Sequence, residues 1–203
     1  MKWGLFFLIP FSLYGLYCGN PGAPEIPEKG MFLPITVPVA VHVGYQGDYV
    51  FQTSREFSYQ MQQGVLTADW IDRVNVFASL GHMMAKGQKG STWGIGTEVL
   101  LFHWNDFLMG INAKYQMAML PRIKYREWQV APAIGYEFKY VRPYAGVSYH
   151  AIYLRQNRIK IAPEDPYVLF FGFGVTPGKG IALNLEGRVI GEAAFSLSIN
   201  FRF

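Results

Sequence analysis

The last eleven residues of the chain, 193–203, alternate between apolar and polar side chains with a period of two. Odd positions from Phe195 to Phe203 are apolar, whereas even positions from Ala194 to Arg202 are small or polar. Because successive side chains of a strand point to opposite faces, this period places the two sets on opposite sides of one β-strand. Such a strand suits an outer-membrane barrel with lipid outside, and it also suits a soluble sandwich.

The same alternation recurs along residues 37–203, where no sustained helical period is present. It predicts strands at 37–52, 55–64, 71–83, 91–104, 107–119, 126–139, 142–154, 167–175, 181–189 and 193–203. A tilted strand needs about 9–11 residues to cross a bilayer, and these segments match that length. We therefore expect an all-β fold, a transmembrane antiparallel up-and-down barrel of about ten strands, with eight or twelve as alternatives.

The composition supports a membrane barrel over a soluble one. The chain is 51% hydrophobic and only 16% charged, whereas a typical soluble domain has about 25% charged residues. After residue 18 no apolar run is long enough for a spanning helix. The polar face of the strands is rich in Gly, Ala, Ser, Asn and Gln, which is unlike the water-facing exterior of a lipocalin-type barrel. The net charge of +4 does not indicate a nucleic-acid partner.

The N-terminal part divides into two segments before the barrel. Lys2 precedes an apolar run, so residues 1–15 are predicted to be a secretory signal peptide, with a short membrane anchor as the alternative. Residues 16–36 are rich in Pro and Gly and lack a core pattern, and the barrel is expected over 37–203. Cys18 is the only cysteine, which excludes an internal disulfide and leaves lipidation open. The expected location is the bacterial outer membrane.

The face opposite the apolar one carries the candidates for the barrel interior. These lumen-lining candidates are His42, Asp48, Arg73, Glu98, Lys114, Glu137, Arg142, His150, Glu186, Arg188 and Arg202. They could form a charge-lined conduit that sets ion preference. Alternatively they could pair with one another and fill the interior, since barrels of about eight strands are packed and those of about sixteen are open. The many glycines on this face favour open space or allow curvature.

Other features predict loops, interfaces and faces. Three connections are longer and basic: 84–90, 120–125 and 155–166. They suit outer loops, which could contact lipopolysaccharide or simply be solvated. Asn105–Asp106, in contrast, suits a tight turn. Pro132 predicts a bulge.

On segment 55–64 we assign Phe57, Tyr59 and Met61 to the lipid face. Aromatic residues expected at the membrane interfaces are Tyr45, Tyr49, Trp93, Tyr115, Trp128 and Tyr153.

The sequence offers no catalytic, cofactor or metal site. Its histidines, His42, His82, His103 and His150, are dispersed, and no nucleophile elbow is present. We therefore expect a protein that is not an enzyme and has no cofactor. The expected partners are outer-membrane lipid and small solutes or ions, with a homo-oligomer possible and no nucleic acid.

Several stretches, in their order along the chain, carry a family resemblance: 18–24, 43–51, 70–77, 127–130, 143–147, 187–190 and 201–203. Together they resemble the chlamydial major outer membrane porin family. The resemblance implies an outer-membrane porin that admits small solutes and strengthens the envelope. It also implies that Phe201 and Phe203 act as a signal read by the barrel-insertion machinery.

The chain departs from that family by being shorter and poor in cysteine. Because Cys18 is its only cysteine, a disulfide between the Cys18 residues of two chains is the only cross-link of this kind that it allows. The expected function is passive diffusion of small solutes or ions together with a structural role in the envelope. The alternative is a non-conducting structural or surface-interaction barrel.

Overall fold

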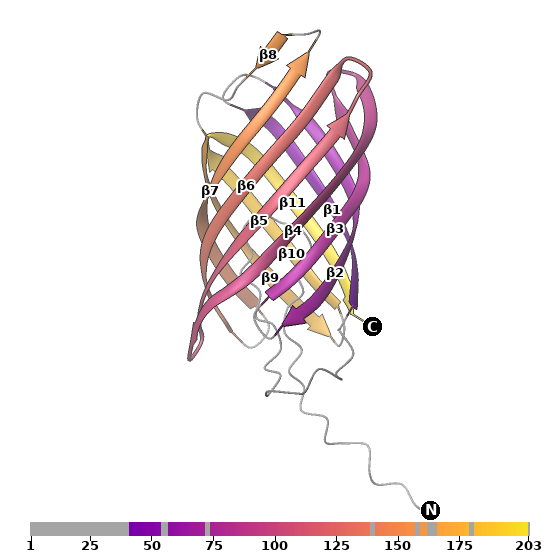
Figure 1. The fold of residues 1–203 in the computed structure, drawn as a ribbon. Helices are drawn as coiled ribbons and strands as arrows, with labels where there is room; N and C mark the ends of the chain where they lie inside the picture. The colour runs from indigo at the N-terminus through magenta and orange to yellow at the C-terminus, as the bar shows by residue number, and fades with distance from the viewer. Residues whose placement is uncertain are drawn as a thin grey trace, which may run out of the picture.

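The computed structural model describes residues 41–53, 57–71, 74–138, 141–156, 159–161, 166–178 and 181–202. These residues form a single antiparallel sheet (Figure 1). Its strands are β1 (Val41–Thr53), β2 (Tyr59–Ile71), β3 (Val74–Ala85), β4 (Gln88–Trp104), β5 (Phe107–Met119), β6 (Ile123–Tyr136), β7 (Val141–Gln156), β8 (Ile159–Ile161), β9 (Tyr167–Gly178), β10 (Ile181–Ile190) and β11 (Glu192–Arg202). Within this part of the chain, no helix is long and apolar enough to span a membrane.

The sheet closes on itself through ten strands. β1 pairs with β11, placing Tyr49 opposite Phe195 and Val43 opposite Phe201. β6 pairs with β7, and β7 pairs onward with β9. β8 is a three-residue strand that pairs with β7 and lies beyond the barrel wall (Figure 1). Closure pairs the backbone hydrogen-bond donors and acceptors that an open sheet edge would leave unpaired in lipid. The expected ten-stranded antiparallel barrel is confirmed.

The two ends of the barrel differ less in loop length than predicted. At one end, called the loop end below, lie β8, the Lys86–Gly87 turn and residues 120–122; the Asn105–Asp106 turn and the end of β11 lie at the other end (Figure 1). The expected loop at 84–90 is wrong, because β3 and β4 continue until a two-residue turn. Lys86 and Gly87 both have positive φ angles, of 48° and 71°, as tight hairpin turns require. The connection after β5 is also short, whereas the one after β7 is long as expected.

Apolar side chains cover the outside of the barrel. The relative exposure of Leu80 is 71% and that of Trp128 is 58%. On β11, Phe195, Leu197 and Phe201 face outward, while Ala194, Ser196, Ser198 and Asn200 are buried. An apolar surface of this extent around a whole barrel is costly in water and is satisfied by lipid. The predicted outward face of the terminal strand is therefore confirmed.

Aromatic side chains gather on the outer wall at two levels. Nearer the loop end, the Tyr115 ring lies 5.6 Å from Trp93 and 4.7 Å from Trp128 between ring centroids. Nearer the other end, Phe107 lies 5.1 Å from Tyr136. Phe107 and Tyr115 both belong to β5. Their separation is about 26 Å along the strand. Because strands of such barrels tilt by about 40° from the barrel axis, this separation is about 20 Å along the axis. Interface girdles are expected at about this separation in a bilayer.

Two local predictions are wrong. Phe57, Tyr59 and Met61 are buried inside the barrel, because they pack against apolar residues of other strands near the loop end. Pro132 causes no bulge: β5 and β6 pair without a register shift, and the β6–β7 register is the same on either side of it.

Candidate functional site

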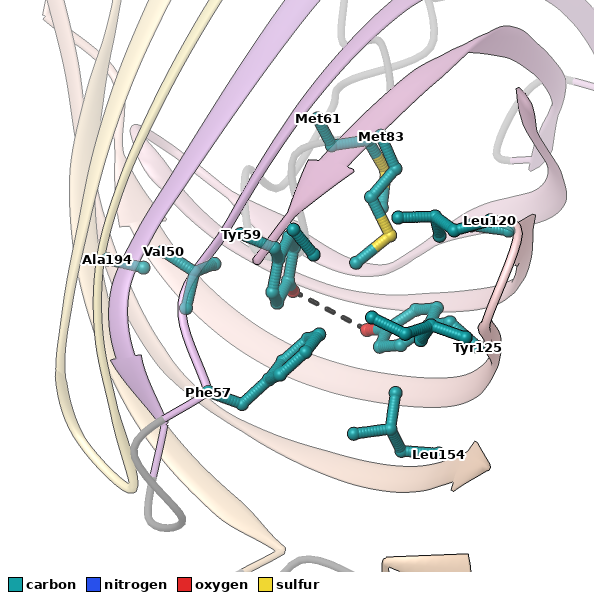
Figure 2. Packing of buried hydrophobic residues seen from close by; sticks show 12 residues of the cluster. Val50, Phe57, Tyr59, Met61, Met83, Leu120, Tyr125, Leu154 and Ala194 are labelled. Carbon is teal, nitrogen blue, oxygen red and sulfur yellow. Dashed lines mark hydrogen bonds between the residues drawn. The ribbon is translucent and has the colours of Figure 1, made fainter. Parts of the chain in front are cut away.

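A cluster of apolar side chains fills the barrel interior at the loop end. Met83 and Tyr125 are 0% and 1% exposed, and both come from strand ends beside the loop-end turns. Figure 2 shows the side chains of Tyr59, Met83 and Tyr125 directed toward one another across the interior. We call this cluster the apolar plug; its members are Val50, Phe57, Tyr59, Met61, Met83, Ala85, Ala118, Leu120, Ile123, Tyr125, Leu154 and Ala194. The plug brings together strands that are far apart around the wall.

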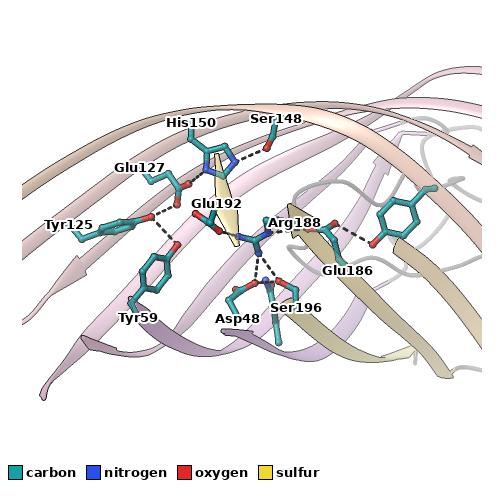
Figure 3. Close-up of polar contacts among 12 residues, drawn as sticks. Asp48, Tyr59, Tyr125, Glu127, Ser148, His150, Glu186, Arg188, Glu192 and Ser196 are labelled. Atoms are coloured by element: carbon teal, nitrogen blue, oxygen red, sulfur yellow. Dashed lines mark hydrogen bonds and ion pairs between the residues drawn. The ribbon is translucent and has the colours of Figure 1, made fainter. Parts of the chain in front are cut away.

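Next to the plug, one buried arginine is surrounded by three carboxylates (Figure 3). The Arg188 guanidinium on β10 lies 2.9 Å from Asp48 Oδ1, 3.3 Å from Glu186 Oε1 and 2.5 Å from Glu192 Oε1. It also donates to Ser196 Oγ at 2.6 Å, and the Ser196 hydroxyl donates to Asp48. We call these five residues the Arg188 network. Charge-assisted hydrogen bonds of this kind link β1, β10 and β11 across the seam where the barrel closes.

A second polar chain lies on β6 and β7. The His150 imidazole lies with Nε2 2.6 Å from Ser148 Oγ and with Nδ1 2.6 Å from Glu127 Oε1. The Tyr125 hydroxyl donates to Glu127 Oε2 at 2.6 Å, and it lies 3.4 Å from the Tyr59 hydroxyl. Figure 3 shows this chain continuing from Ser148 to Tyr59. The two tyrosines also belong to the plug, so the apolar and polar layers share side chains.

Ser148, His150 and Glu127 are arranged as a nucleophile, base and acid are in serine hydrolases. The serine hydroxyl in this group is fully buried, since Ser148 is 0% exposed. It also donates to the Val168 carbonyl oxygen at 3.5 Å. A substrate has no access to this serine in the described conformation. The group links buried polar side chains of β6 and β7.

The predicted interior residues fall into three groups. The structure buries Asp48, Glu98, Lys114, His150, Glu186 and Arg188 inside the barrel. Arg142 lies 3.4 Å from Glu137, and both side chains remain partly exposed. His42 and Arg202 lie opposite each other in the β1–β11 pairing, but their side chains, together with Arg73 and Phe203, lie outside the described part of the structure. The segments 1–15 and 16–36 also lie outside it.

Several interior residues were not predicted from the sequence. Glu127 and Glu192 are buried carboxylates that complete the two networks. Glu127 has the same parity as the predicted lumen-lining residue Glu137 in the expected strand 126–139, so the alternation contained the signal for it. Glu192 is the first residue of β11 and precedes the clear alternation. Its even position matches those of Ala194 and Ser196, so the alternation of the terminal strand extends to it.

Beyond these networks, the interior holds Glu98, Lys114, uncharged polar side chains and large residues facing glycines. Gln116 Nε2 donates to Thr92 Oγ1 at 2.5 Å. A methyl group at Gly94 would collide with Gln116, and one at Gly96 would collide with the Phe77 ring. These glycines therefore make room for neighbouring side chains. No group of three or more metal-ligating side chains occurs among the residues that the structure describes.

Comparisons with known proteins agree in barrel shape only. No family model matches the chain, and no curated protein matches its sequence. The β-domain of the Bordetella autotransporter BrkA is 10% identical, with a TM-score of 0.49, covering 81% of this chain and 98% of that one. An outer membrane channel from Pseudomonas putida is 8% identical, with a TM-score of 0.46, covering 93% and 100%. KdgM porin is 8% identical, with a TM-score of 0.41, covering 80% and 99%.

Proposed function

We propose that this chain is an outer-membrane β-barrel with a closed interior, which serves the envelope as a structural or surface component. The observation that carries this proposal is the apolar plug together with the adjoining Arg188 network. Met83 and Tyr125 meet inside the barrel, and Arg188 is held by partners from three strands. A water-filled conduit would leave such side chains exposed to solvent. Their burial therefore favours a barrel that does not conduct in this conformation.

The membrane placement is supported by the outer wall. It is apolar over most strands, and it carries aromatic groups at two levels separated by about 20 Å. The signal peptide expected over 1–15 agrees with export to the outer membrane. The resemblance to the chlamydial porin family implies the same outer-membrane location. Within this proposal, Phe201 and Phe203 form the signal that the barrel-insertion machinery reads.

Passive diffusion of small solutes or ions is the second candidate. It is favoured by the polar side chains that line the interior away from the plug, among them Gln46, Gln63, Asn112 and Ser198. For this function the plug residues would have to move aside. The two candidates therefore differ in whether the resting barrel conducts.

Planar-bilayer recording of the refolded protein separates these candidates. We expect no unitary conductance from the unaltered chain, and we expect discrete steps from the double variant Tyr125→Ala, Met83→Ala, which empties part of the plug. The matched control is Met119→Ala, which shortens an exposed side chain on the outer wall of β5 and should remain silent. Persistent conductance of the unaltered chain would establish the diffusion channel and refute the closed barrel.

A further inference from the structure

Five exposed cationic side chains cluster on neighbouring strands at the loop end. Lys89 lies near the start of β4, Arg122 in the turn after β5, Lys124 and Arg126 on β6, and Arg155 near the end of β7. Lys124 is paired in register with both Met119 of β5 and Arg155 of β7. We call these five residues the basic sector.

The cations of the basic sector face outward, away from the carboxylates of the interior. Lys124 and Arg126 share the exposed face of β6 with Trp128, whereas Glu127, between Arg126 and Trp128, is buried. Among the described residues, no member of the sector makes an ion pair. Like charges held this close repel one another, so an anion bound between them is favoured.

On the other strands, the described part of the loop end carries no such outward charge, and the exposed Lys86 in the β3–β4 turn lies with Nζ 5.8 Å from the centroid of the Phe57 ring. On the six other strands of the barrel, the outermost described residues that face outward are uncharged: Phe51, Gln60, Met84, Tyr167, Val189 and Ala193. The opposite end has the exposed carboxylate Asp106 at the corresponding β4–β5 turn. Among the described strands, the outward-facing cations of the loop end are therefore gathered on β4, β6, β7 and the turn between β5 and β6, which general solvation of a rim does not require.

The position of the sector indicates the kind of anion. Arg126 is the next outward residue of β6 beyond Trp128, whose ring packs on Tyr115 in the aromatic group of the outer wall. Aromatic side chains of this type mark the level of lipid headgroups. Lys and Arg at that level suit phosphate oxygens, which Arg can bind through two parallel hydrogen bonds. From β4 to β7 the sector spans about 14 Å, which is wider than one phosphate group.

We infer that the basic sector binds the headgroup of a glycolipid carrying two phosphates, in the membrane leaflet at the loop end. The acyl chains of this lipid lie along the apolar wall formed by Trp128 and Val130, both exposed below Arg126. The inference rests on the proposed membrane placement and is independent of whether the interior conducts.

The test is a binding titration of the full refolded chain in dodecyl maltoside micelles, read by native mass spectrometry. The probes are diphosphoryl lipid A, the same lipid after removal of both phosphates, and inorganic phosphate. We expect the diphosphorylated lipid to bind more tightly than the dephosphorylated one. The double variant Lys124→Gln, Arg126→Gln should weaken that binding about 25-fold, from about fivefold for each of the two cations near a headgroup.

The matched control is Ser58→Glu, Gln60→Glu, which lowers the net charge by the same amount at the loop end but outside the sector. It should leave the affinity unchanged. Equal weakening by this control, full binding by the sector variant, or displacement of the lipid by millimolar inorganic phosphate would each overturn the inference. Refolding into lipid vesicles, measured separately, would fail if the membrane placement were wrong, whereas only lipid A binding would fail if this inference were wrong.

Discussion

Replacement of Arg188 by methionine should be among the most damaging single substitutions in this barrel. The Arg188 side chain is 5% exposed, and the carboxylates of Asp48, Glu186 and Glu192 around it are equally buried. Methionine keeps much of the side-chain volume but leaves three buried carboxylates without their cation. Removal of one partner from a buried ion pair costs about 3–5 kcal/mol. We expect a loss in this range in the free energy of unfolding.

The measurement is urea unfolding of the barrel in lipid vesicles, followed by tryptophan fluorescence. The midpoint should fall while the denaturant slope stays constant, because the surface exposed on unfolding does not change. Lys124→Met is the matched control, since it removes an exposed cation that makes no ion pair with any other described residue, and it should change stability by less than about 0.5 kcal/mol.

A compensated variant sharpens the test of the Arg188 network. Neutralising two carboxylates in the same background, by Asp48→Asn and Glu192→Gln, should recover much of the loss, because a buried ionic cluster can often be replaced as a whole at little cost. A loss below about 1 kcal/mol for Arg188→Met, or no recovery in the triple variant, would refute the idea that this arginine balances the buried carboxylates.

Three further outcomes follow from the geometry. Leu197→Arg places a charge on the lipid face and should lower the free energy of unfolding by about 2–4 kcal/mol if the residue lies near the bilayer centre. The same unfolding assay measures this loss, and a loss below about 1 kcal/mol would mean that Leu197 does not face lipid. Gly96→Ala should cost about 1–3 kcal/mol through a collision inside the wall, whereas Gly64→Ala, whose nearest contact would be 3.9 Å away, should be nearly neutral; equal effects would contradict the packing. Ser148 should resist a fluorophosphonate probe in the folded barrel because it is fully buried, and rapid labelling would show an accessible nucleophile.

The lipid-facing side of most strands could be predicted from the sequence. On β5 every second residue from Phe107 to Met119 faces outward, as the alternation indicates, and Asn112, Lys114 and Gln116 are buried. The period of two is informative here because lipid selects apolar side chains on one face and the interior accepts polar ones on the other. The closure of the first strand onto the last follows from the same lipid environment, because lipid cannot satisfy the backbone groups of an open sheet edge.

The plug could not be predicted in this way, because its residues are apolar on the inner face. On β2 the interior receives Phe57, Tyr59 and Met61, while Leu66 faces outward farther along the strand. When both faces carry apolar side chains, alternation does not tell which side meets lipid. The ends of β3 and β4 were mispredicted for a related reason. Both strands continue beyond the apolar band to the Lys86–Gly87 turn, and the polar residues there pair through the backbone as regularly as the apolar ones do.

Whether the interior is open or filled depends on pairs of residues across neighbouring strands, and single positions do not determine it. Phe77 lies opposite Gly96 in the β3–β4 register, and Tyr144 lies opposite Gly172 between β7 and β9. In both pairs the large side chain occupies the space that a Cβ atom on the glycine would need. Inward glycines taken alone suggest a wide lumen, but matched with large partners they allow a packed one. A ten-stranded wall is thus compatible with either state, and the register between strands selects the filled interior here.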